Sequence, residues 1–456
     1  MRHIVCKWCV ASSLLLNLVA QAETRPQYGG TLRAASSATI TSLDPADAAQ
    51  MNSFARNNIT ALLFDTLVTL DKAGRVQPSL AVSWQASSDN RRWSLRIRPS
   101  VAFHDGSPLT AEAVAKSLRM ANTAWNVFPE NDSVTIQSEM PTPTMLAVLA
   151  LPRNAIVKRT TDRVTLGTGP FRVTDWQPAK KLTLAANDDS WHGRPFLDTV
   201  EIELGRGYRD QIASLEADRS GLIEIPAEVS RRLAPSSHLV SFSAPMEMIG
   251  IIFSRDAEAP DELTLREALT LCLDRASLHN VLLQGSGEAD GGILPDWMTG
   301  YAALFPAHAD LQRARLLRQQ VQAVPGWNLQ YDASDPLLRL VAERISLNAR
   351  DAGLAVNPVT NQGADARLVR LVFPSTDARV DLEVAAAAAG LTFPPVGNES
   401  IEELYTAEQK MLSPRRIIPL LHLPAVYAAT QKLQRWEPDA SGTWRLADAW
   451  LEPSTP

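Results

Sequence analysis

The chain has 456 residues, of which 45% are hydrophobic and 21% are charged, and its formal net charge is −6. This length exceeds what one hydrophobic core usually supports, so two or more domains are expected, and the ordinary composition excludes a disordered or fibrous protein. The sequence has no dense run of Lys and Arg and no sustained mixing of aromatic with basic residues, so nucleic acid is not expected as a partner.

The N-terminal segment has the pattern of a secretory signal peptide. Arg2 and Lys7 form a basic region, residues 10–20 are mostly apolar, and residues 20–22 read Ala-Gln-Ala, a small-x-small cleavage site. The alternative is a membrane anchor, but the apolar run falls short of the roughly 20 residues that span a bilayer. We therefore expect residues 1–22 to be a cleaved signal peptide.

The first half of the chain predicts short strands around two helices. Thr31–Ala35 is expected to form a strand, followed by a small polar loop. Residues Ser53–Val68 have helical apolar spacing, and Thr110 is a good N-cap for a helix over Ala111–Asn122. Further strands are predicted for two runs within Ser83–Arg98 and for Val134–Ile136, Thr144–Leu149, Phe171–Asp175, Leu182–Ala185 and Val200–Leu204.

The second half predicts an α/β unit. An apolar strand follows Ser241, and Leu263–Leu283 reads as one long amphipathic helix. Helices and strands alternate after it, which is typical of an α/β lobe. The helices are predicted at Asp310–Val321, Asp335–Ala352, Val384–Gly390 and Ile401–Met411, and the strands at Leu329–Tyr331 and Leu368–Phe373.

Two motifs suggest chemistry at first sight, and both are better explained as turns. In FHDGSPLTAEAV, His104 and Asp105 lack any partner at metal-ligand spacing, whereas Asp105-Gly106 forms a turn before the Thr110 cap. GTGPF, starting at Gly167, lacks the ending of a phosphate loop and precedes a strand. There is no nucleophile elbow, and Cys272 lies in an apolar helical pattern. The sequence therefore predicts no catalytic residue, no metal site and no cofactor.

An ordered series of motifs resembles the family 5 extracellular solute-binding proteins, which serve ABC importers of oligopeptides, dipeptides, nickel chelates and related solutes. The resemblance covers most of the chain from Tyr28 to about Tyr331, and the run Leu62–Leu118 is highly specific. The motifs are YGGTLRAA, SLDPADA, LLFDTLVTLDKAGRVQPSLAVSW, WSLRIRPSVAFHDGSPLTAEAVAKSL, GTGPFRVTDW and LREALTLCLDRASL.

The resemblance implies an α/β fold of the type II periplasmic binding protein class, a two-lobed Venus-flytrap clamp with an extra subdomain in lobe one. Lobe one would comprise residues 28–245 with an inserted subdomain at about 51–164, lobe two residues 246–427, and the C-terminal return to lobe one residues 428–456. The crossovers near Pro245 and Pro424 would form the hinge. Ligand between the lobes favours closure because it contacts both only in the closed state.

The same resemblance implies a function and a set of ligand-binding residues. We expect a monomeric periplasmic receptor, without catalysis, that delivers a small polar or peptide-like solute to an ABC permease in the inner membrane. Its ligand-binding residues are expected in the loop after the first strand, at the two crossovers and at the lip of lobe two: Ser36, Ser37, Thr39, Thr41, Met246, Glu247, Met248, His422 and Trp297.

One departure from the family pattern bears on the ligand. Peptide binders of this family usually carry, late in lobe two, a tryptophan-containing segment with an acidic residue for the peptide's amino terminus. Here the segment reads LVFPSTDARVDLEVAAAAAG, in which Asp377 and Asp381 match no such motif, and lobe two is short. An envelope sensor or scaffold without transport is the alternative function, and an exported hydrolase is a third class.

Overall fold

The computed structural model describes residues 25–47, 53–160, 165–233, 238–323, 325–397 and 400–453. The expected signal peptide, residues 1–22, lies outside these described residues. Within them, no helix combines the length and the apolar character needed to cross a membrane.

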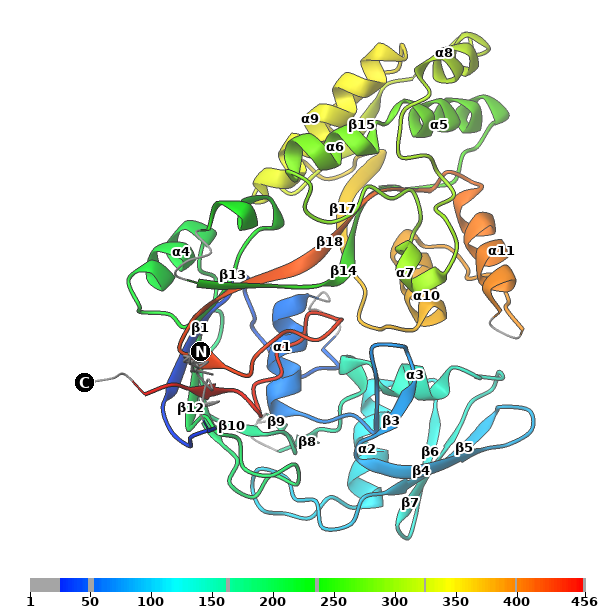
Figure 1. The fold of residues 1–456 in the computed structure, drawn as a ribbon. Coiled ribbons are helices and arrows are strands. Elements are labelled where there is room, and N and C mark those ends of the chain that lie inside the picture. The colour runs from blue at the N-terminus through cyan, green and yellow to red at the C-terminus, as the bar shows by residue number, and fades with distance from the viewer. Residues whose placement is uncertain are drawn as a thin grey trace, which may run out of the picture.

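The main sheet has ten strands and runs through both halves of the molecule (Figure 1). Its strands are β1 (Thr31–Ala35), β10 (Phe171–Gln177), β11 (Lys181–Ala186), β12 (Thr199–Glu203), β13 (Leu222–Glu224), β14 (His238–Phe253), β15 (Trp327–Gln330), β16 (Val356–Val359), β17 (Ala366–Val372) and β18 (Ile417–Thr430). Their order is β10-β11-β12-β1-β13-β18-β14-β17-β15-β16. We call the half with β1 and β10–β13 lobe one and the half with β15–β17 lobe two.

The long antiparallel strands β14 and β18 connect the two lobes (Figure 1). Pro245 of β14 lies opposite Pro424 of β18, and the register shifts on both sides of Pro245. Proline has no N–H to donate to a ladder, so the pairing is weakest where two prolines face each other. The two prolines expected at the crossovers are therefore cross-strand neighbours at an irregular point of the sheet.

Lobe one is closed on one face by α1 (Phe54–Leu63) and by the C-terminal segment, and α4 (Tyr208–Glu216) flanks it on the other side (Figure 1). Ser53 caps α1 by accepting a hydrogen bond from Arg56 N. The core on the α1 side contains Leu32, Leu62 and Val200 together with Tyr427 and Trp444 from the end of the chain. A small ladder of β19 (Leu433–Gln434) and β20 (Trp450–Leu451) completes the C-terminal segment.

The inserted subdomain has its own sheet and core, and we count it from β2 onward, later than the expected residue 51, because α1 packs into the core of lobe one. Its elements are β2 (Val68–Leu70), β3 (Val76–Pro78), β4 (Ala81–Ala86), β5 (Arg92–Ile97), α2 (Ala111–Ala121), β6 (Asn126–Glu130), β7 (Ser133–Gln137), α3 (Met145–Leu149) and a 3-10 turn at Pro152–Asn154. The four strands are ordered β4-β5-β7-β6, and α2 packs its buried residues Val114 and Leu118 against them. The short pair β8 (Lys158–Arg159) and β9 (Thr165–Leu166) leads back to lobe one.

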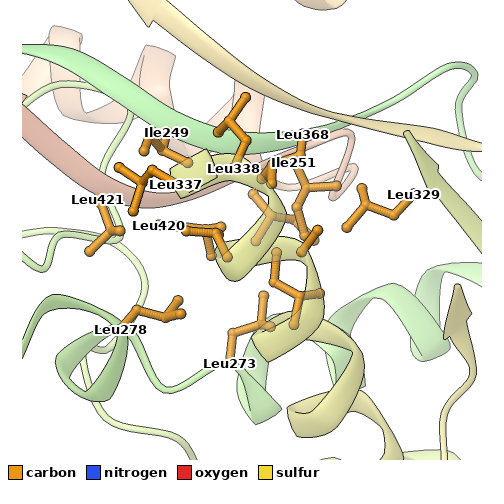
Figure 2. Close-up of a cluster of buried hydrophobic side chains, with 14 of the residues drawn as sticks. Ile249, Ile251, Leu273, Leu278, Leu329, Leu337, Leu338, Leu368, Leu420 and Leu421 are labelled. Carbon is orange, nitrogen blue, oxygen red and sulfur yellow. The ribbon is translucent and has the colours of Figure 1, made fainter. Parts of the chain in front are cut away.

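Lobe two covers both faces of its half of the sheet with helices. They are α5 (Pro260–Cys272), α6 (Arg275–Leu282), α7 (Asp296–Thr299), α8 (Leu311–Gln319), α9 (Pro336–Asp351), α10 (Ala378–Ala389) and α11 (Ile401–Leu412). Figure 2 shows the cluster in which Ile249 and Ile251 of β14 meet Leu337 and Leu338 of α9. On the opposite face, residues of α10 and α11 share a second cluster with Met246 and Met248 of β14.

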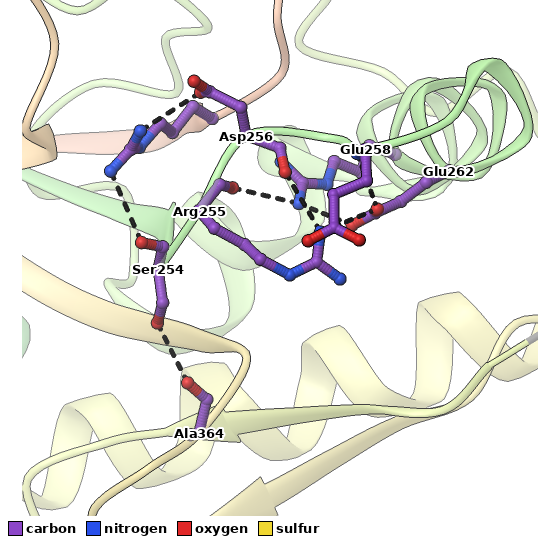
Figure 3. A network of polar contacts seen from close by, with 8 residues as sticks. Ser254, Arg255, Asp256, Glu258, Glu262 and Ala364 are labelled. Carbon is purple, nitrogen blue, oxygen red and sulfur yellow. Dashed lines mark hydrogen bonds and ion pairs between the residues drawn. The ribbon is translucent and has the colours of Figure 1, made fainter.

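A polar network holds the outer end of β14 to α5 (Figure 3). Glu262 pairs with Arg255 at 2.9 Å and with the buried Arg266 at 2.6 Å, and the Arg266 guanidinium lies 4.0 Å from the ring centroid of Phe253. The Ser254 hydroxyl also donates to the carbonyl oxygen of Ala364 at 2.9 Å. These contacts fix the direction in which the chain leaves the sheet.

Three sequence predictions differ from the observed elements. Within the predicted strand Thr144–Leu149, residues 145–149 form helix α3, because a short apolar run has no diagnostic period and Met, Leu and Ala favour helix. The predicted helix Leu263–Leu283 is split, because Asp274 leaves helical geometry and caps α6 through Ser277 N. Helix α1 ends at Leu63, since Phe64 is already extended, so Val68 begins a strand.

Candidate functional site

A cavity of about 360 Å³ lies where lobe one, the subdomain and lobe two meet. Helix α1 forms one wall, and the end of β2 with the turn after it forms another. The remaining walls come from residues 150–155 of the subdomain, from residues 374–376, which follow β17, and from residues 439–445 of the C-terminal segment. The site is therefore assembled from four stretches that lie far apart in the sequence, of which the first, residues 57–72, includes most of α1 and the end of β2.

Two polar side chains of α1 line the cavity without protein partners. Asn57 is 4% exposed and Thr60 is 5% exposed, and neither side chain makes a hydrogen bond with a described residue. The adjacent Asn58 behaves differently, because its amide donates to Tyr427 Oη at 3.1 Å and accepts from Trp444 N at 2.9 Å. Asn57 and Thr60 therefore present to the cavity polar groups that no described residue engages.

One carboxylate of the cavity, Asp65, is held by three side chains. Trp191 Nε1 and Thr168 Oγ1 donate to its Oδ2 atom at 2.9 and 2.7 Å, and His192 Nε2 lies 3.4 Å from its Oδ1 atom. Burial alone would raise the pKa of the Asp65 carboxyl, but these partners hold it below its ordinary value. Asp65 is therefore an ionised group whose hydrogen bonds tie the end of α1 to the loops of lobe one.

The other two carboxylates form local turns. Asp71 accepts from Ala73 N and Arg75 N and pairs with the Arg75 side chain at 2.8 Å. Asp439 accepts from Ser441 N and Thr443 N and pairs with Arg445 at 3.1 Å. Both side chains are thus committed to shaping the loops that surround the cavity.

Contacts between the subdomain and lobe two border the cavity. Thr376 Oγ1 donates to the carbonyl oxygen of Asp71 at 3.3 Å, and Val380 of α10 packs with Ala147 and Leu151 of the subdomain. The structure therefore has the two lobes in contact on the subdomain side, with the cavity enclosed between these contacts and α1.

The expected ligand loop after β1 does not line this cavity, and two of its residues, Ser36 and Ser37, are hydrogen-bonded within lobe one. Ser37 N and Ser37 Oγ both hydrogen-bond Glu224 Oε2, at 2.9 and 3.2 Å, and Ser36 Oγ accepts from Ala38 N. Burial raises the pKa of Glu224 above its ordinary value. Thr39 and Thr41 are exposed. The role of these four residues in ligand binding stays a prediction.

The crossover residues are enclosed. Met246 and Met248 are buried in the core under α10 and α11, and Glu247 pairs with Arg370 of β17 at 2.5 Å. His422 is fully buried, and its Nε2 atom lies 2.9 Å from the carbonyl oxygen of Ile293. Burial lowers the pKa of His422, which is consistent with a neutral ring that donates to this carbonyl.

Trp297, the aromatic residue expected at the lip of lobe two, lies on α7 and is 40% exposed. Trp297 is not among the residues that line the cavity.

The sequence prediction did not identify the residues that form the cavity. The one local signal was the pair of polar residues Asn57 and Thr60 within an otherwise apolar helical face.

The FHDG and GTGPF motifs, which suggested chemistry in the sequence, are hydrogen-bonded to each other. His104 N donates to Gly167 O at 2.9 Å, Gly167 N donates to His104 Nδ1 at 3.3 Å, and His104 Nε2 lies 3.1 Å from Gly169 O. This pattern requires a neutral ring with its proton on Nε2, and burial lowers the pKa of His104. Lys158 and Ser107 outweigh the slight burial of Asp105 and lower its pKa to about 2. FHDG and GTGPF therefore join the subdomain to lobe one.

A buried carboxyl in lobe two gives a pH-dependent stability. Ile293 N and Tyr301 Oη donate to the two oxygens of Glu408 at 2.5 and 2.6 Å. Burial raises the pKa of Glu408 from 4.5 to about 7. Between these values the folded state keeps a proton that the unfolded state has released, so the free energy of unfolding falls as pH rises.

We expect Glu408→Gln to remove this dependence, because the amide is uncharged, its carbonyl oxygen can accept from Ile293 N, and its NH2 group can donate to Tyr301 Oη. At pH 8 the variant should unfold with a free energy up to about 3 kcal/mol higher than the unsubstituted protein, with the difference vanishing near pH 4.5. Urea denaturation from pH 4.5 to 8 measures it. Equal pH profiles for both proteins would contradict the assignment of this proton to Glu408.

Among the described residues, no group of three or more His, Cys, Asp or Glu side chains is placed to hold a metal ion.

The described free cysteine, Cys272, is buried, and burial raises the pKa of its thiol to about 12, which makes the thiol a poor nucleophile. The cavity's described polar groups suit binding by hydrogen bonds and charge.

Comparison with known proteins gives one family and one fold. Residues 75–370 match the model of the bacterial extracellular solute-binding proteins, family 5 middle region. The probable D,D-dipeptide-binding periplasmic protein DdpA of Escherichia coli (strain K12) is 24% identical over 62% of this chain, and the match spans only 60% of DdpA. The glutathione-binding protein GsiB of Pectobacterium atrosepticum is 23% identical over 85% of this chain and 82% of its own length.

Solved structures share the two-lobed architecture. NikA from Staphylococcus aureus, in complex with Ni(L-His)2, superposes with a TM-score of 0.79, at 16% identity, over 92% of this chain and 100% of its own. The periplasmic binding protein AgaA from A. tumefaciens R10, in complex with agropinic acid, superposes with a TM-score of 0.78, at 18% identity, over 93% of this chain and 99% of its own. The expected type II periplasmic binding protein fold is confirmed.

Proposed function

Because the chain belongs to the family 5 bacterial extracellular solute-binding proteins, we propose that it captures a small solute in the cavity between its lobes. The family consists of binding proteins, not enzymes. In this proposal the mature protein works without catalysis in the periplasm, as a monomer, and presents the loaded form to an ABC permease. The relatives DdpA and GsiB, whose names denote dipeptide and glutathione binding, support a small polar solute.

The observation that carries the proposal is the composition of the cavity wall. Asn57 and Thr60 come from lobe one, Leu70 from the subdomain, and Ser375 and Thr376 from lobe two. A solute in this position touches both lobes only when they are closed, so its binding energy favours closure.

The proposed hinge lies at the facing prolines Pro245 and Pro424. Register shifts beside them leave this part of the β14–β18 ladder with fewer regular hydrogen bonds than the rest. With this hinge, lobe two extends from residue 246 to about 427, and the C-terminal return begins near residue 428.

The cavity assignment can be tested by filling it. Ala61→Trp places an indole on the cavity face of α1, whereas Ala387→Trp places the same side chain on an exposed position of α10. Native mass spectrometry of the purified proteins should detect a bound solute on the unsubstituted chain and on Ala387→Trp. It should detect none on Ala61→Trp, because the indole occupies the solute's volume.

Two results would oppose the proposal in different ways. A solute retained by folded Ala61→Trp would show that the binding site lies outside this cavity. No bound solute on the unsubstituted chain, together with no thermal stabilisation by dipeptides, glutathione, opines or nickel chelates, would contradict a solute receptor altogether.

A further inference from the structure

Resting on the proposed receptor function, we propose that the cavity selects a small solute with an anionic group, such as a carboxylate, and does not require a free ammonium group. The anion would lie at Lys72, and a neutral polar group of the solute would lie at Asn57 and Thr60. The inference follows from which polar groups of the cavity are already paired and which are not.

Lys72 supplies the unpaired charge. It lies in the turn between β2 and β3 and lines the cavity, and its ammonium group has no hydrogen bond or ion pair with any described residue. The neighbouring Asp71 does not neutralise it, because the Asp71 oxygens already accept from Arg75 and Gln77 side chains and from two backbone N–H groups. A carboxylate of the solute would give Lys72 the partner that the protein does not supply.

The three described carboxylates of the cavity are all engaged elsewhere. Asp71 and Asp439 each pair with an arginine, and Asp65 accepts from Trp191 and Thr168. A solute ammonium group would have to displace one of these partners and break the turn or loop that it stabilises. The ammonium end of a peptide therefore lacks the receiving carboxylate that it would need.

The inner wall accepts a neutral polar group. The Asn57 amide offers both a donor and an acceptor, and the Thr60 hydroxyl can do either, one turn further along α1. Because neither side chain has a partner among the described residues, a solute amide or hydroxyl can hydrogen-bond to both without displacing a protein group.

The size and the remaining lining limit the solute further. About 360 Å³ is at the small end of the roughly 300–1,000 Å³ typical of small-molecule sites. Apolar side chains cover much of the rest, among them Phe64, Leu70, Ala150, Pro152 and Pro374. The inferred solute thus has a short, partly apolar body between its acidic and neutral polar ends.

Four probes on one skeleton separate charge from shape: N-acetyl-Ala-Ala, Ala-Ala, Ala-Ala amide and N-acetyl-Ala-Ala amide. Isothermal titration calorimetry with the solute-free protein should rank N-acetyl-Ala-Ala at least about tenfold tighter than Ala-Ala amide. Lys72→Gln should reduce this preference to less than about threefold. Lys116→Gln, an exposed lysine of α2, should leave it unchanged.

A second variant tests the neutral end. Asn57→Leu should weaken the binding of the two acetylated probes by a similar factor and leave their ratio unchanged, because it removes a neutral hydrogen bond. It should not lower the melting temperature of the empty protein, since the Asn57 side chain makes no hydrogen bond with a described residue. An unchanged melting temperature distinguishes loss of binding from loss of folding.

The outcomes also separate this inference from the proposed function. Equal or tighter binding of Ala-Ala amide, an unchanged preference in Lys72→Gln, or no binding of any probe would overturn the anion selectivity. In each of these cases a bound solute on the unsubstituted chain that is lost in Ala61→Trp would still uphold the receptor. Absence of that solute, with no stabilising ligand, would overturn the receptor itself.

Discussion

Gly167→Ala is expected to lower the free energy of unfolding by about 3 kcal/mol or more. A Cβ atom at this position would overlap the carbonyl oxygen of Leu63 and would lie 2.5 Å from the Phe64 ring. Because the clash is with backbone at the end of α1, no side-chain rotation relieves it. The shift would also disturb the two hydrogen bonds between Gly167 and His104.

Gly207→Ala is the matched control, because nothing lies within 4 Å of a Cβ at Gly207 and its backbone has an ordinary negative φ. Chemical denaturation should give a loss of no more than about 1 kcal/mol for this variant, because Gly207 is the N-cap of α4 and alanine is a poorer cap than glycine. If both variants unfold at the same denaturant concentration, the close approach of the GTG loop to α1 does not stabilise the fold.

Arg370→Met is expected to lower the free energy of unfolding by about 3 kcal/mol at neutral pH. Arg370 pairs with Glu247 at 2.5 Å and with Asp335 at 2.9 Å. Without the Arg370 guanidinium, the Glu247 carboxylate has lost its cationic partner, and only 8% of the Glu247 side chain is exposed to solvent. We place the effect at the low end of the range for breaking buried pairs, because a third of the Arg370 side chain remains exposed.

Two variants check the origin of this effect. Arg367 is an exposed residue of the same strand, β17, so Arg367→Met should change the free energy of unfolding little. Adding Glu247→Gln to Arg370→Met should restore part of the lost stability, because the uncompensated charge is removed. A double variant that is less stable than Arg370→Met would contradict the ion pair as the cause. Urea denaturation of all four proteins measures the differences.

The elements that could be predicted from the sequence have strong local signals. Thr31–Ala35 was found as a strand with those bounds, and Thr110 caps α2 through Ala113 N as its residue type suggests. The prediction of α3 as a strand was wrong because five apolar residues fit either periodicity. The interruption at Asp274 was missed because the apolar spacing continues through the cap.

The cavity could not be located from local pattern. Asn57 and Asn58 are adjacent and identical in type, yet only the structure shows that Asn58 bonds Tyr427 and Trp444 while Asn57 is left unpartnered at the cavity. Residues 374–376 and 439–445 carry no signature of a binding wall. Their proximity results from tertiary contacts, which no short sequence window contains.

The C-terminal segment also bears on how the chain folds. Ala425, Tyr427, Trp436, Trp444 and Leu446 complete a core that otherwise comes from the first half of the chain. During synthesis, lobe one therefore lacks part of its core until residues 425–446 have emerged, whereas lobe two needs β18 from this part of the chain. Because contacts across some 400 residues form slowly, the newly made chain has an extended period without its final core.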